Sequence, residues 1–262
     1  MSIDRTLVKH LFIKKERRTS MSETTFLDLS KGYGIEGDIN VDRISPRQVL
    51  IVNSEDLSGL CISPGALREN IVLDKVSTEI FKPGGLITFP SGAAIRLTFY
   101  CEPCKRIAHL VDSLKDVREK RGILGVVVQT GRIEIEDIAE IEPNYFPALP
   151  EKPYERFLDF ILKIPKGKVV TYKQVLRGIG VDRSYFRVIP LYIKKAPEIY
   201  PIHRILDSQG KIISHIPQQK ELLEAEGIKF ISPLDSSDDR SSLSLLKYAW
   251  QDSSVYFGKD FL

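Results

Sequence analysis

The stretch Ile164–Arg204, IPKGKVVTYKQVLRGIGVDRSYFRVIPLYIKKAPEIYPIHR, decides the fold of the C-terminal part of the chain. Thr171 and Gln174 have the spacing of a capping box, in which each side chain bonds the backbone of the other, and this predicts a helix start. Gly178 and Gly180 predict the end of that helix, because glycine readily takes the left-handed conformation that closes helices. The stretch therefore contains a short helix with a defined start and end.

A second, basic helix is expected over residues 184–196, with Pro190 as an interruption of its hydrogen-bond pattern. Two short helices joined by glycine-containing residues indicate a helix-turn-helix. Between residues 163 and 195 a single acidic residue, Asp182, stands against nine basic ones. Such a patch favours a polyanion as partner, and a solvated basic face is the alternative. The basic residues are Lys163, Lys166, Lys168, Lys173, Arg177, Arg183, Arg187, Lys194 and Lys195.

The composition is that of an ordinary globular chain of one or two domains, with 262 residues, 42% hydrophobic and 28% charged. The whole chain carries a net charge of +3. Residues 151–230 alone hold 15 Lys and Arg residues against nine Asp and Glu residues. The positive charge is therefore concentrated in one segment, which favours a local nucleic-acid surface.

The sequence contains no apolar run long enough to cross a bilayer, and its N-terminus lacks the order of a signal peptide. Three cysteines, Cys61, Cys101 and Cys104, are too few for a disulfide framework in a chain of this length and fit a reducing setting. We expect Cys61 to be a packing residue. We expect a cytoplasmic protein without a membrane partner, associated with the nucleoid if it binds DNA.

The first half of the chain contains many short apolar runs bounded by glycine, proline or serine, a pattern typical of strands. Residues 7–15 and 132–142 are predicted strands, and one helix is expected near residues 105–114. Many short strands with a single helix of this length indicate a mainly-β, barrel-like first domain.

Four prolines between residues 143 and 153 predict a stiff connector between two domains. Within the tail beyond it, residues 235–242 are expected to be disordered or a linker, and residues 243–250 to form one or two helical turns. The expected plan is a β-rich domain over residues 7–142, a linker over 143–153, an α-rich domain over 154–230 and a Ser- and Asp-rich tail over 231–262.

Residues 154–230 carry, in order, a set of motifs that resembles the C-terminal domain of alkylguanine-DNA alkyltransferases over nearly the whole segment. The resemblance implies an α-rich, winged-helix-like DNA-binding domain with a helix-turn-helix. The matching residues are Ile164-Pro165-Lys166-Gly167-Lys168-Val169, Thr171-Tyr172, Arg187-Val188, Pro201-Ile202-His203-Arg204, Leu222-Leu223 and Glu226-Gly227.

Ile202 stands where the transferases have the cysteine that accepts the alkyl group. A hydrocarbon side chain cannot act as that nucleophile, and no cysteine follows Cys104 in the sequence. The segment therefore resembles the alkyltransferase-like proteins, which bind alkylated guanine in DNA without repairing it and mark it for excision repair. The resemblance implies double-stranded DNA and an excision-repair protein as partners.

The same resemblance implies roles for individual residues. Arg187 would enter the base stack as a finger that fills the gap left by an extruded nucleotide, and Tyr172 would help to rotate that nucleotide out. Ile202 would line the lesion pocket, while His203 and Glu226 would keep a structural hydrogen bond. The expected lesion pocket is Tyr172, Ile202, His203, Arg204 and Glu226, and the expected DNA-binding residues are Tyr172, Arg187, Lys168, Lys173, Arg183 and Lys194.

Two positions depart from the transferase pattern, since Pro190 replaces the usual glycine and Ala196 replaces an asparagine. Pro190 removes a backbone donor from the expected recognition helix, and Ala196 removes a hydrogen bond at a hinge of the family. These positions leave altered docking, or a domain that no longer binds DNA, as the alternative.

Residues 7–142 resemble the MOSC domain, named for the C-terminal regions of molybdenum-cofactor sulfurases. The resemblance implies a sulfur carrier at Cys104, since a carrier needs a polarizable nucleophile. It also implies molybdenum cofactor (molybdopterin) as a ligand, with Arg47, Arg68 and Asn70 as donors, and molybdenum and pyridoxal phosphate binding as associated functions. The matching residues are Gly34-Ile35-Glu36-Gly37-Asp38, Arg47-Gln48-Val49, Pro64-Gly65, Arg68-Glu69-Asn70 and Cys101-Glu102-Pro103-Cys104.

Other interpretations of Cys104 stay open. A zinc site with Cys101 would need further ligands that the sequence does not pair with them, and a disulfide between them lacks a thioredoxin-like context. A buried structural thiol is the third alternative. We expect no metal site. Two functions therefore compete: a non-catalytic DNA-lesion binder, and a sulfur- or molybdopterin-handling enzyme centred on Cys104 with a vestigial second domain.

Overall fold

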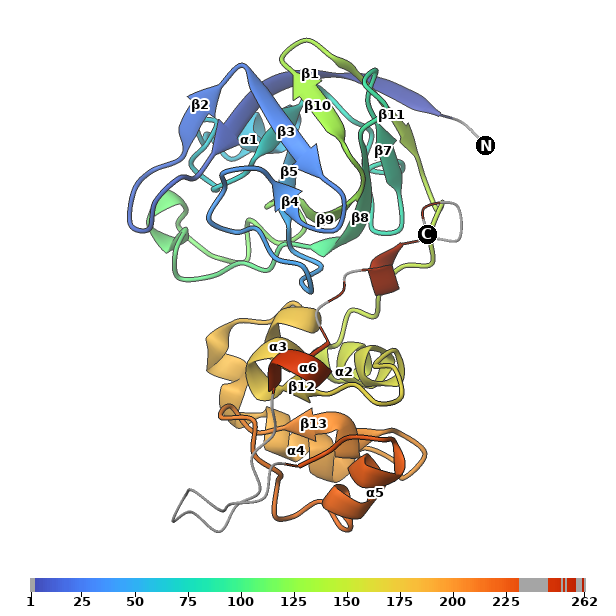
Figure 1. The fold of residues 1–262 in the computed structure, drawn as a ribbon. Helices are drawn as coiled ribbons and strands as arrows, with labels where there is room; N and C mark the ends of the chain where they lie inside the picture. Colours follow the sequence, from blue (N-terminus) through green and yellow to red (C-terminus); the bar gives the residue numbers. More distant parts are fainter. Residues whose placement is uncertain (1–2, 231–244, 251, 253, 258–260, 262) are drawn as a thin grey trace. The chain divides into compact units, whose positions relative to one another are not determined.

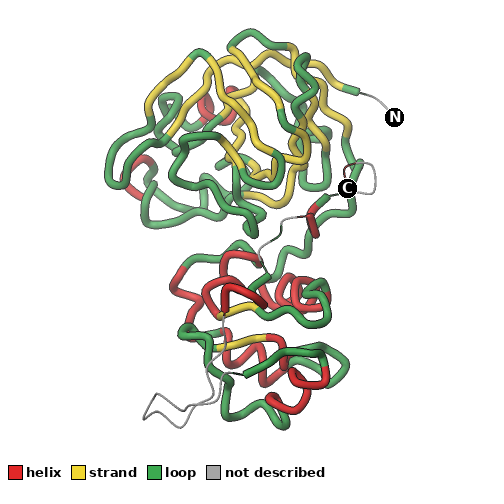
Figure 2. Tube along the Cα trace, viewed as in Figure 1, coloured by secondary structure: helices red, strands yellow, loops and turns green. Residues whose placement is uncertain are grey.

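The computed structural model describes residues 3–230, 245–250, 252, 254–257 and 261. The chain forms two compact units (Figure 1), of which unit 1 comprises residues 1–149 and 253–262 and unit 2 comprises residues 150–252. Strands dominate unit 1 and helices dominate unit 2 (Figure 2). Among the described residues, no helix combines the length and the apolar character that crossing a membrane requires.

Unit 1 is a closed β-barrel, which confirms the mainly-β domain predicted from the short apolar runs. Its strands are ordered β11-β7-β8-β9-β5-β6-β1-β2, and β11 also pairs with β1, so that seven of them return on themselves. A second sheet has the order β10-β3-β4. The elements are β1 (Asp4–Ile13), β2 (Ser22–Thr24), β3 (Phe26–Ser30), β4 (Gly34–Ile35), β5 (Val49–Asn53), α1 (Ser54–Gly59), β6 (Ile71–Leu73), β7 (Leu86–Thr88), β8 (Ala94–Tyr100), β9 (Ile123–Gln129), β10 (Gly131–Glu134) and β11 (Ile138–Glu142).

Strand β5 shows how the barrel is packed, because all five of its residues are buried. Successive side chains of a strand point to opposite faces of the sheet. Val49 and Ile51 join a cluster drawn from all seven barrel strands, whereas Leu50 and Val52 join a second cluster on the other face. The barrel therefore has a filled interior and a second apolar layer outside it.

Two predictions about unit 1 are wrong. Residues 105–114 form a short 3-10 turn, Ala108–Leu110, within irregular backbone rather than a helix. Ile107 is the one fully buried side chain of this segment, so the segment has no apolar stripe to hold a helix against the core. Cys61 is exposed rather than packed, and it follows α1 with a left-handed backbone (φ 54°) where the chain turns away from the helix.

The proline-rich segment 143–153 contains the junction between the units, which falls after Leu149. Phe146 and Leu149 are buried in the outer apolar layer of unit 1. Pro153 is the first residue of α2 (Pro153–Leu162), where proline fits because the first helical N–H has no partner within the helix. Both ends of the segment are thus built into the units that it joins.

Unit 2 packs short helices around a two-stranded parallel sheet of β12 and β13. The predicted capping box of α3 is confirmed, because Thr171 Oγ1 accepts from the Gln174 N–H (3.4 Å) and Gln174 Oε1 accepts from the Thr171 N–H (2.8 Å). The remaining elements are β12 (Val170–Thr171), α3 (Tyr172–Gly178), the 3-10 turns η2 (Arg183–Arg187) and η3 (Ile202–Arg204), α4 (Ile189–Lys195), β13 (Ile205–Leu206), α5 (Gln219–Ala225) and α6 (Leu245–Tyr248).

The predicted single helix over residues 184–196 is wrong in one respect. The segment divides into η2 and α4, and Pro190 lies in the first turn of α4 instead of interrupting a longer helix. At that position the missing N–H of proline costs no helical hydrogen bond. Pro190 therefore lies where α4 begins.

The described residues of the C-terminal segment belong to both units. Trp250 is buried in unit 2, where its N–H donates to Val169 O (2.9 Å), and Val169 N–H donates to Tyr248 O (2.9 Å). Tyr256 is buried in unit 1, where its carbonyl oxygen accepts from the guanidinium of Arg96. The predicted helical turns of residues 243–250 are present as α6, and residues 235–242 lie outside the described part of the chain.

Candidate functional site

The elements η2 and α4 carry exposed basic residues of unit 2. Ile189 and Ile193 are fully buried and hold α4 against the rest of the unit, so the opposite face is left to solvent. Arg183, Arg187 and Lys194 are exposed there and make no ion pair within the described residues. The structure thus presents these three predicted DNA-binding residues on one short basic surface.

The other two predicted DNA-binding lysines lie on neighbouring elements. Lys173 is exposed on the first turn of α3. Lys168 is half-buried just before β12, and its Nζ donates to the carbonyl oxygen of Lys247 (3.4 Å). Lys168 is therefore tied to the C-terminal segment of its own unit, whereas Lys173 is open to solvent.

Tyr172, the predicted nucleotide-rotating residue, begins α3 and is 8% exposed. Its ring meets the ring of Phe186 edge to face, with centroids 5.9 Å apart. Burial raises the pKa of the Tyr172 phenol, and the carboxylate of Asp207 adds to this shift. The phenol therefore stays neutral and keeps a proton to donate.

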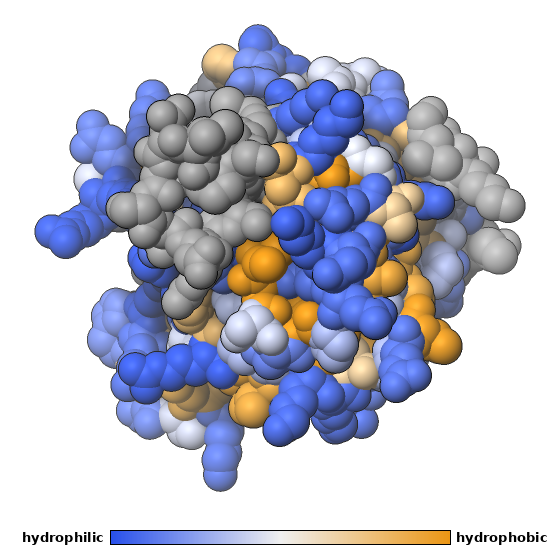
Figure 3. All heavy atoms as spheres, turned by 60° about the horizontal axis from the view of Figure 1, so that its bottom comes forward, coloured by the Kyte–Doolittle hydropathy of each residue, from blue (hydrophilic) through white to orange (hydrophobic). Residues whose placement is uncertain are grey.

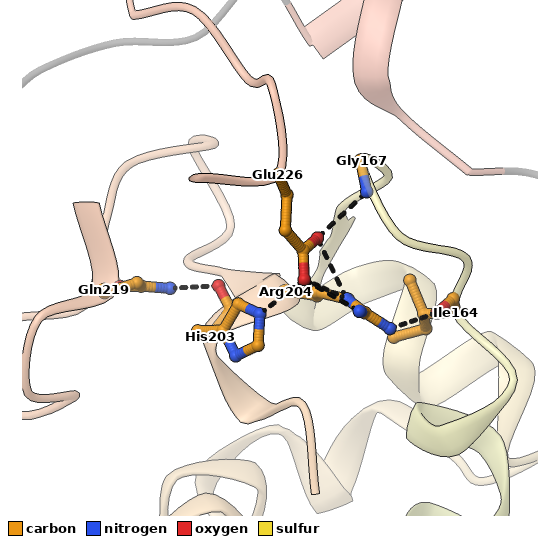
Figure 4. Close-up of polar contacts among 6 residues, drawn as sticks. All are labelled: Ile164, Gly167, His203, Arg204, Gln219 and Glu226. Carbon is orange, nitrogen blue, oxygen red and sulfur yellow. Dashed lines mark hydrogen bonds and ion pairs between the residues drawn. The ribbon is translucent and has the colours of Figure 1, made fainter. Parts of the chain in front are cut away.

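Glu226 holds the Pro-Ile-His-Arg loop in place (Figure 4). Its Oε1 lies 2.9 Å from His203 Nε2 and 2.7 Å from a terminal guanidinium nitrogen of Arg204. Its Oε2 accepts from the Gly167 N–H (2.9 Å) and from Arg204 Nε (3.1 Å). Arg204 also donates to Ile164 O (2.7 Å). One carboxylate therefore joins the turn at Gly167, the loop and the end of α5.

The charge of Glu226 is stabilised by these contacts. Burial alone would raise the pKa of Glu226, but the hydrogen bonds from Arg204, the Gly167 amide and His203 outweigh it and lower the pKa to about 2. His203 is held at its other end as well, since Gln219 Nε2 donates to its carbonyl oxygen (2.9 Å). The side chains of His203, Arg204 and Glu226 come together as expected for a structural network.

The residues predicted to line the lesion pocket lie in two groups. His203, Arg204 and Glu226 contact one another, and Ile202 is half-buried at the start of the same 3-10 turn. The contacts of Tyr172 run instead to Phe186, a residue that sequence reasoning did not select. An aromatic residue directly before Arg187 was the available signal for it.

Unit 1 holds a second constellation around Cys104. The guanidinium of Arg121 donates to Cys104 Sγ (3.3 Å) and to Glu102 O, and it is 5% exposed. Arg121 Nε is buried without a hydrogen-bond partner among the described residues. Sequence reasoning missed Arg121, because no local pattern in the sequence marks it as a partner of Cys104.

Two basic cavities adjoin one another in unit 1, and Arg121 lines the smaller of them together with Cys101, whereas Cys104 lines neither. The larger, of about 700 Å³, and the smaller, of about 150 Å³, share Asn40, Arg68 and Arg106 in their walls. Arg68 takes a left-handed backbone (φ 68°), which costs free energy for a residue with a side chain. Burial and the neighbouring guanidinium groups of Arg106 and Arg121 lower the pKa of Arg68. The other basic residues of the two walls are Lys14, Arg17, Arg18, Arg47, His109 and Arg121.

The predicted cofactor donors occupy different positions around these cavities. Arg47 and Arg68 line them. Asn70 lines the smaller one, but its side chain accepts from the Leu50 N–H (3.1 Å) and donates to Phe12 O and Asp38 Oδ2 (both 3.2 Å). Asn70 therefore holds β5 and β1 together. Within the described residues no group of three or more His, Cys, Asp or Glu side chains is placed to hold a metal ion.

Residues 152–228 match the family "6-O-methylguanine DNA methyltransferase, DNA binding domain". Alkyltransferase-like protein 1 of Schizosaccharomyces pombe is 35% identical over 105 residues, which cover 37% of this chain and 94% of that protein. A DNA base-flipping protein of Vibrio parahaemolyticus is 35% identical over 96 residues, which cover 35% of this chain and 88% of that protein. A bifunctional methyltransferase-like/endonuclease of Nanoarchaeum equitans is 33% identical over 111 residues, 41% of this chain, and the chain spans 34% of its length.

Solved structures align with each unit. The YUAD protein of Bacillus subtilis covers 53% of this chain and 97% of its own, with 20% identity and a TM-score of 0.48. The S. pombe Atl1 structure in complex with damaged DNA containing O6-carboxymethylguanine covers 38% of this chain and 96% of its own, with 30% identity and a TM-score of 0.34. Because the sequence identity extends over nearly the full length of the S. pombe protein, the chain belongs to the alkyltransferase-like family, and unit 2 is the part that matches.

Proposed function

We propose that unit 2 binds duplex DNA and recognises alkylated guanine by extruding the damaged nucleotide, without transferring the alkyl group. The observation that carries this proposal is Ile202 in an otherwise retained frame. The His203–Glu226 hydrogen bond and the Arg204–Glu226 ion pair hold the loop in place, while the position of the acceptor thiol carries a hydrocarbon. Two relatives support the proposal: S. pombe Atl1 has been solved in complex with damaged DNA containing O6-carboxymethylguanine, and the Vibrio relative is a DNA base-flipping protein.

The exposed cations supply the attraction for DNA. Arg187, Arg183 and Lys194 have no competing carboxylate among the described residues, so their charges are available to phosphates. Arg187 is the residue that enters the stack, because a planar guanidinium stacks on bases and also neutralises phosphate charge. The neutral phenol of Tyr172 donates a hydrogen bond to the phosphate or base that rotates past it.

Alkyl transfer is excluded by the chemistry of unit 2. All three cysteines of the sequence, Cys61, Cys101 and Cys104, precede residue 105 and belong to unit 1. The lesion therefore stays on the DNA, and an excision-repair protein is the partner that would act on it.

A binding titration tests this proposal. The full chain is titrated into labelled duplexes with and without one O6-alkylguanine, at a stated salt concentration. Tighter binding to the damaged duplex is expected, and Arg187→Ala should reduce it more than tenfold, whereas Arg5→Ala in unit 1 should leave it unchanged. Equal affinity of the unaltered chain for both duplexes would contradict the proposal. Incubation with a duplex labelled on its alkyl group should leave no label on the protein.

A second candidate function, in unit 1, rests on Arg121, which contacts Cys104 Sγ and also lines the smaller of the two basic cavities. The residues fit an anionic ligand, because the buried Arg121 Nε has no partner among the described residues and Arg68 faces like charges. Molybdenum cofactor is the ligand that the MOSC resemblance suggests, and it would supply redox chemistry when bound. Arg68 and Arg121 would hold its anionic groups, with Cys104 as the sulfur carrier.

This second candidate is tested by sulfur loading and ligand binding. Cys104→Ser should abolish persulfide formation after exposure to a sulfane-sulfur donor, while Cys61→Ser should leave it intact. Arg121→Leu should weaken the binding of an anionic pterin without altering the fold of the barrel. If Cys104→Ser carries as much sulfur as the unaltered chain, the carrier role is wrong.

A further inference from the structure

The basic surface of unit 2 contains two apolar side chains that the core does not require. Leu191 on α4 is 64% exposed and Phe186 on η2 is 38% exposed. On a helix that buries one face, the opposite face is normally polar. Ile189 and Ile193 supply the buried face of α4. Leu191 lies on the opposite face, so its exposure follows from its position on the helix and not from poor packing of the core.

Basic residues surround Leu191 on the same helix face. Residues three or four positions apart are neighbours on a helix surface. Lys194 and Lys195 follow Leu191 at these spacings, and Arg187 precedes it by four positions. The backbone is helical from Val188 onward, since the Tyr192 N–H donates to Val188 O (3.0 Å). Figure 3, which brings the lower end of Figure 1 forward, shows hydrophobic surface lying between hydrophilic side chains.

Phe186 is fixed at the other side of Arg187. Its ring stands edge-on to the buried ring of Tyr172, with an interplanar angle of 71°. Edge-to-face contacts of this kind hold an aromatic ring in one orientation. Phe186, Arg187 and Leu191 are thus all exposed within one segment, residues 183–197, that contains no acidic residue.

We propose that Phe186 and Leu191 form an apolar wedge that enters the base stack beside Arg187 and unstacks the step next to the extruded nucleotide. The proposal rests on the proposed function of unit 2. Proteins that open or kink DNA from the minor groove insert apolar side chains between base steps and surround them with cations. The charges of Arg187, Lys194 and Lys195 match the phosphates of a duplex, whereas an apolar protein partner would gain nothing from them.

The contribution of the wedge can be distinguished from that of the phosphate contacts by the salt dependence of the dissociation constant. Leu191→Ala and Phe186→Ala remove apolar contact and leave charge unchanged, so each should weaken binding to an intact damaged duplex about tenfold. The slope of log Kd against log salt should stay the same. Arg187→Ala should instead reduce that slope by about one.

A second experiment uses a duplex whose base pairs beside the lesion are already disrupted. With two mismatched base pairs beside the O6-alkylguanine, the unstacking cost is largely removed, so the two wedge variants should bind it within about threefold of the unaltered chain. A 2-aminopurine next to the lesion reports unstacking directly. Its fluorescence should rise on binding of the unaltered chain and rise less with Leu191→Ala.

Leu162→Ala is the matched control, because Leu162 on α2 is 54% exposed and the substitution removes the same atoms. It should change neither affinity nor fluorescence. If Leu191→Ala and Phe186→Ala behave like Leu162→Ala while the unaltered chain still prefers damaged DNA, the wedge is wrong and the proposed function stands. If the unaltered chain shows no such preference, the proposed function fails and the wedge fails with it.

Discussion

Glu226 is the residue on which the geometry of the Pro-Ile-His-Arg loop, residues 201–204, depends. Its carboxylate accepts from Gly167 and from the adjacent residues His203 and Arg204, which precede it in the sequence by 59, 23 and 22 positions. Glu226→Gln removes the charge and leaves Arg204 without its ion-pair partner. We expect the free energy of unfolding of unit 2 to fall by about 3 kcal/mol at pH 7. Urea unfolding followed by fluorescence measures this, because Trp250 is the only tryptophan of the sequence and is buried in unit 2.

The carboxylate of Glu226 also makes the stability of unit 2 depend on pH in the acid range. The pKa of Glu226 is lowered from 4.5 to about 2, so the folded state binds its proton less readily than the unfolded chain. The stabilisation, about 3 kcal/mol, is complete above roughly pH 5 and is lost as the pH falls toward 2. Urea midpoints measured between pH 6 and pH 2 should therefore converge for the unaltered chain and Glu226→Gln. Glu224→Gln, an exposed neighbour, should follow the unaltered chain throughout.

The cysteines of unit 1 should differ in reactivity. Burial raises the pKa of the Cys101 thiol, so that this thiol stays protonated and is also shielded. Cys61 is exposed. Brief treatment of the native protein with iodoacetamide at pH 8 should label Cys61 and spare Cys101, as read by peptide mass spectrometry. Labelling of Cys101 at the rate of Cys61 before unfolding would contradict the burial that the structure shows.

Some residues of the two candidate sites could be predicted individually from the sequence, and others could not. Ile202, His203 and Glu226 could be placed because they belong to contiguous motifs or to a fixed order of motifs. Arg121 could not, because it reaches Cys104 across a turn and belongs to no local pattern. Asn70 matched a motif, yet the structure assigns its amide to three backbone and side-chain partners that only the folded barrel brings near.

Among the elements, α3 offers a direct test of its cap. Thr171 Oγ1 and Gln174 Oε1 satisfy backbone donors at the start of the helix, and Gln174 Nε2 also donates to Trp250 O (3.0 Å). Thr171→Ala should lower the free energy of unfolding of unit 2 by about 1–2 kcal/mol. Thr171→Ser keeps a hydroxyl at the cap and should lose less than half of that amount, in the same fluorescence-monitored urea titration.

The contact between α2 and α3 depends on Gly178. A Cβ at this position would lie 2.2 Å from the ring of Phe160, which is itself buried. Gly178→Ala should therefore destabilise unit 2 by at least about 2 kcal/mol, since a well-packed core resists added atoms. Gly59→Ala in α1 is the control, because its Cβ would meet no atom within 4 Å and alanine favours helix. Thermal unfolding followed by circular dichroism should show a loss for the first and no loss for the second.

Elements with capping signals were predictable, and elements defined by tertiary packing were not. The capping box and the strand-rich first domain follow from local chemistry. The predicted helix near residues 105–114 failed because Ile107 alone is anchored in the core. The prediction for Pro190 was wrong because proline breaks the interior of a helix but fits its first turn. The sequence alone does not show that α4 begins at Ile189, directly before this proline.

For the whole molecule, the structure extends unit 2 beyond the predicted end at residue 230. Trp250 packs near Phe160, with ring centroids 5.6 Å apart, and pairs with Val169 through the backbone. A fragment of residues 150–252 should melt cooperatively, whereas a fragment of residues 150–230 loses a buried tryptophan, a change of about 3 kcal/mol or more. For a unit of this size, the midpoint of thermal unfolding should fall by at least about 12 °C. Equal midpoints for the two fragments would show that the C-terminal segment does not belong to unit 2.

The path of the chain through unit 1, into unit 2 and back to Tyr256 has a consequence for biosynthesis. The backbone carbonyls of Pro147 and Tyr256 both accept from Arg96, yet they leave the ribosome more than a hundred residues apart. The barrel therefore gains the contact between Arg96 and Tyr256 only after unit 2 has been translated. A premature stop within unit 2 would yield a barrel in which the guanidinium of Arg96 lacks its hydrogen bond to Tyr256 O.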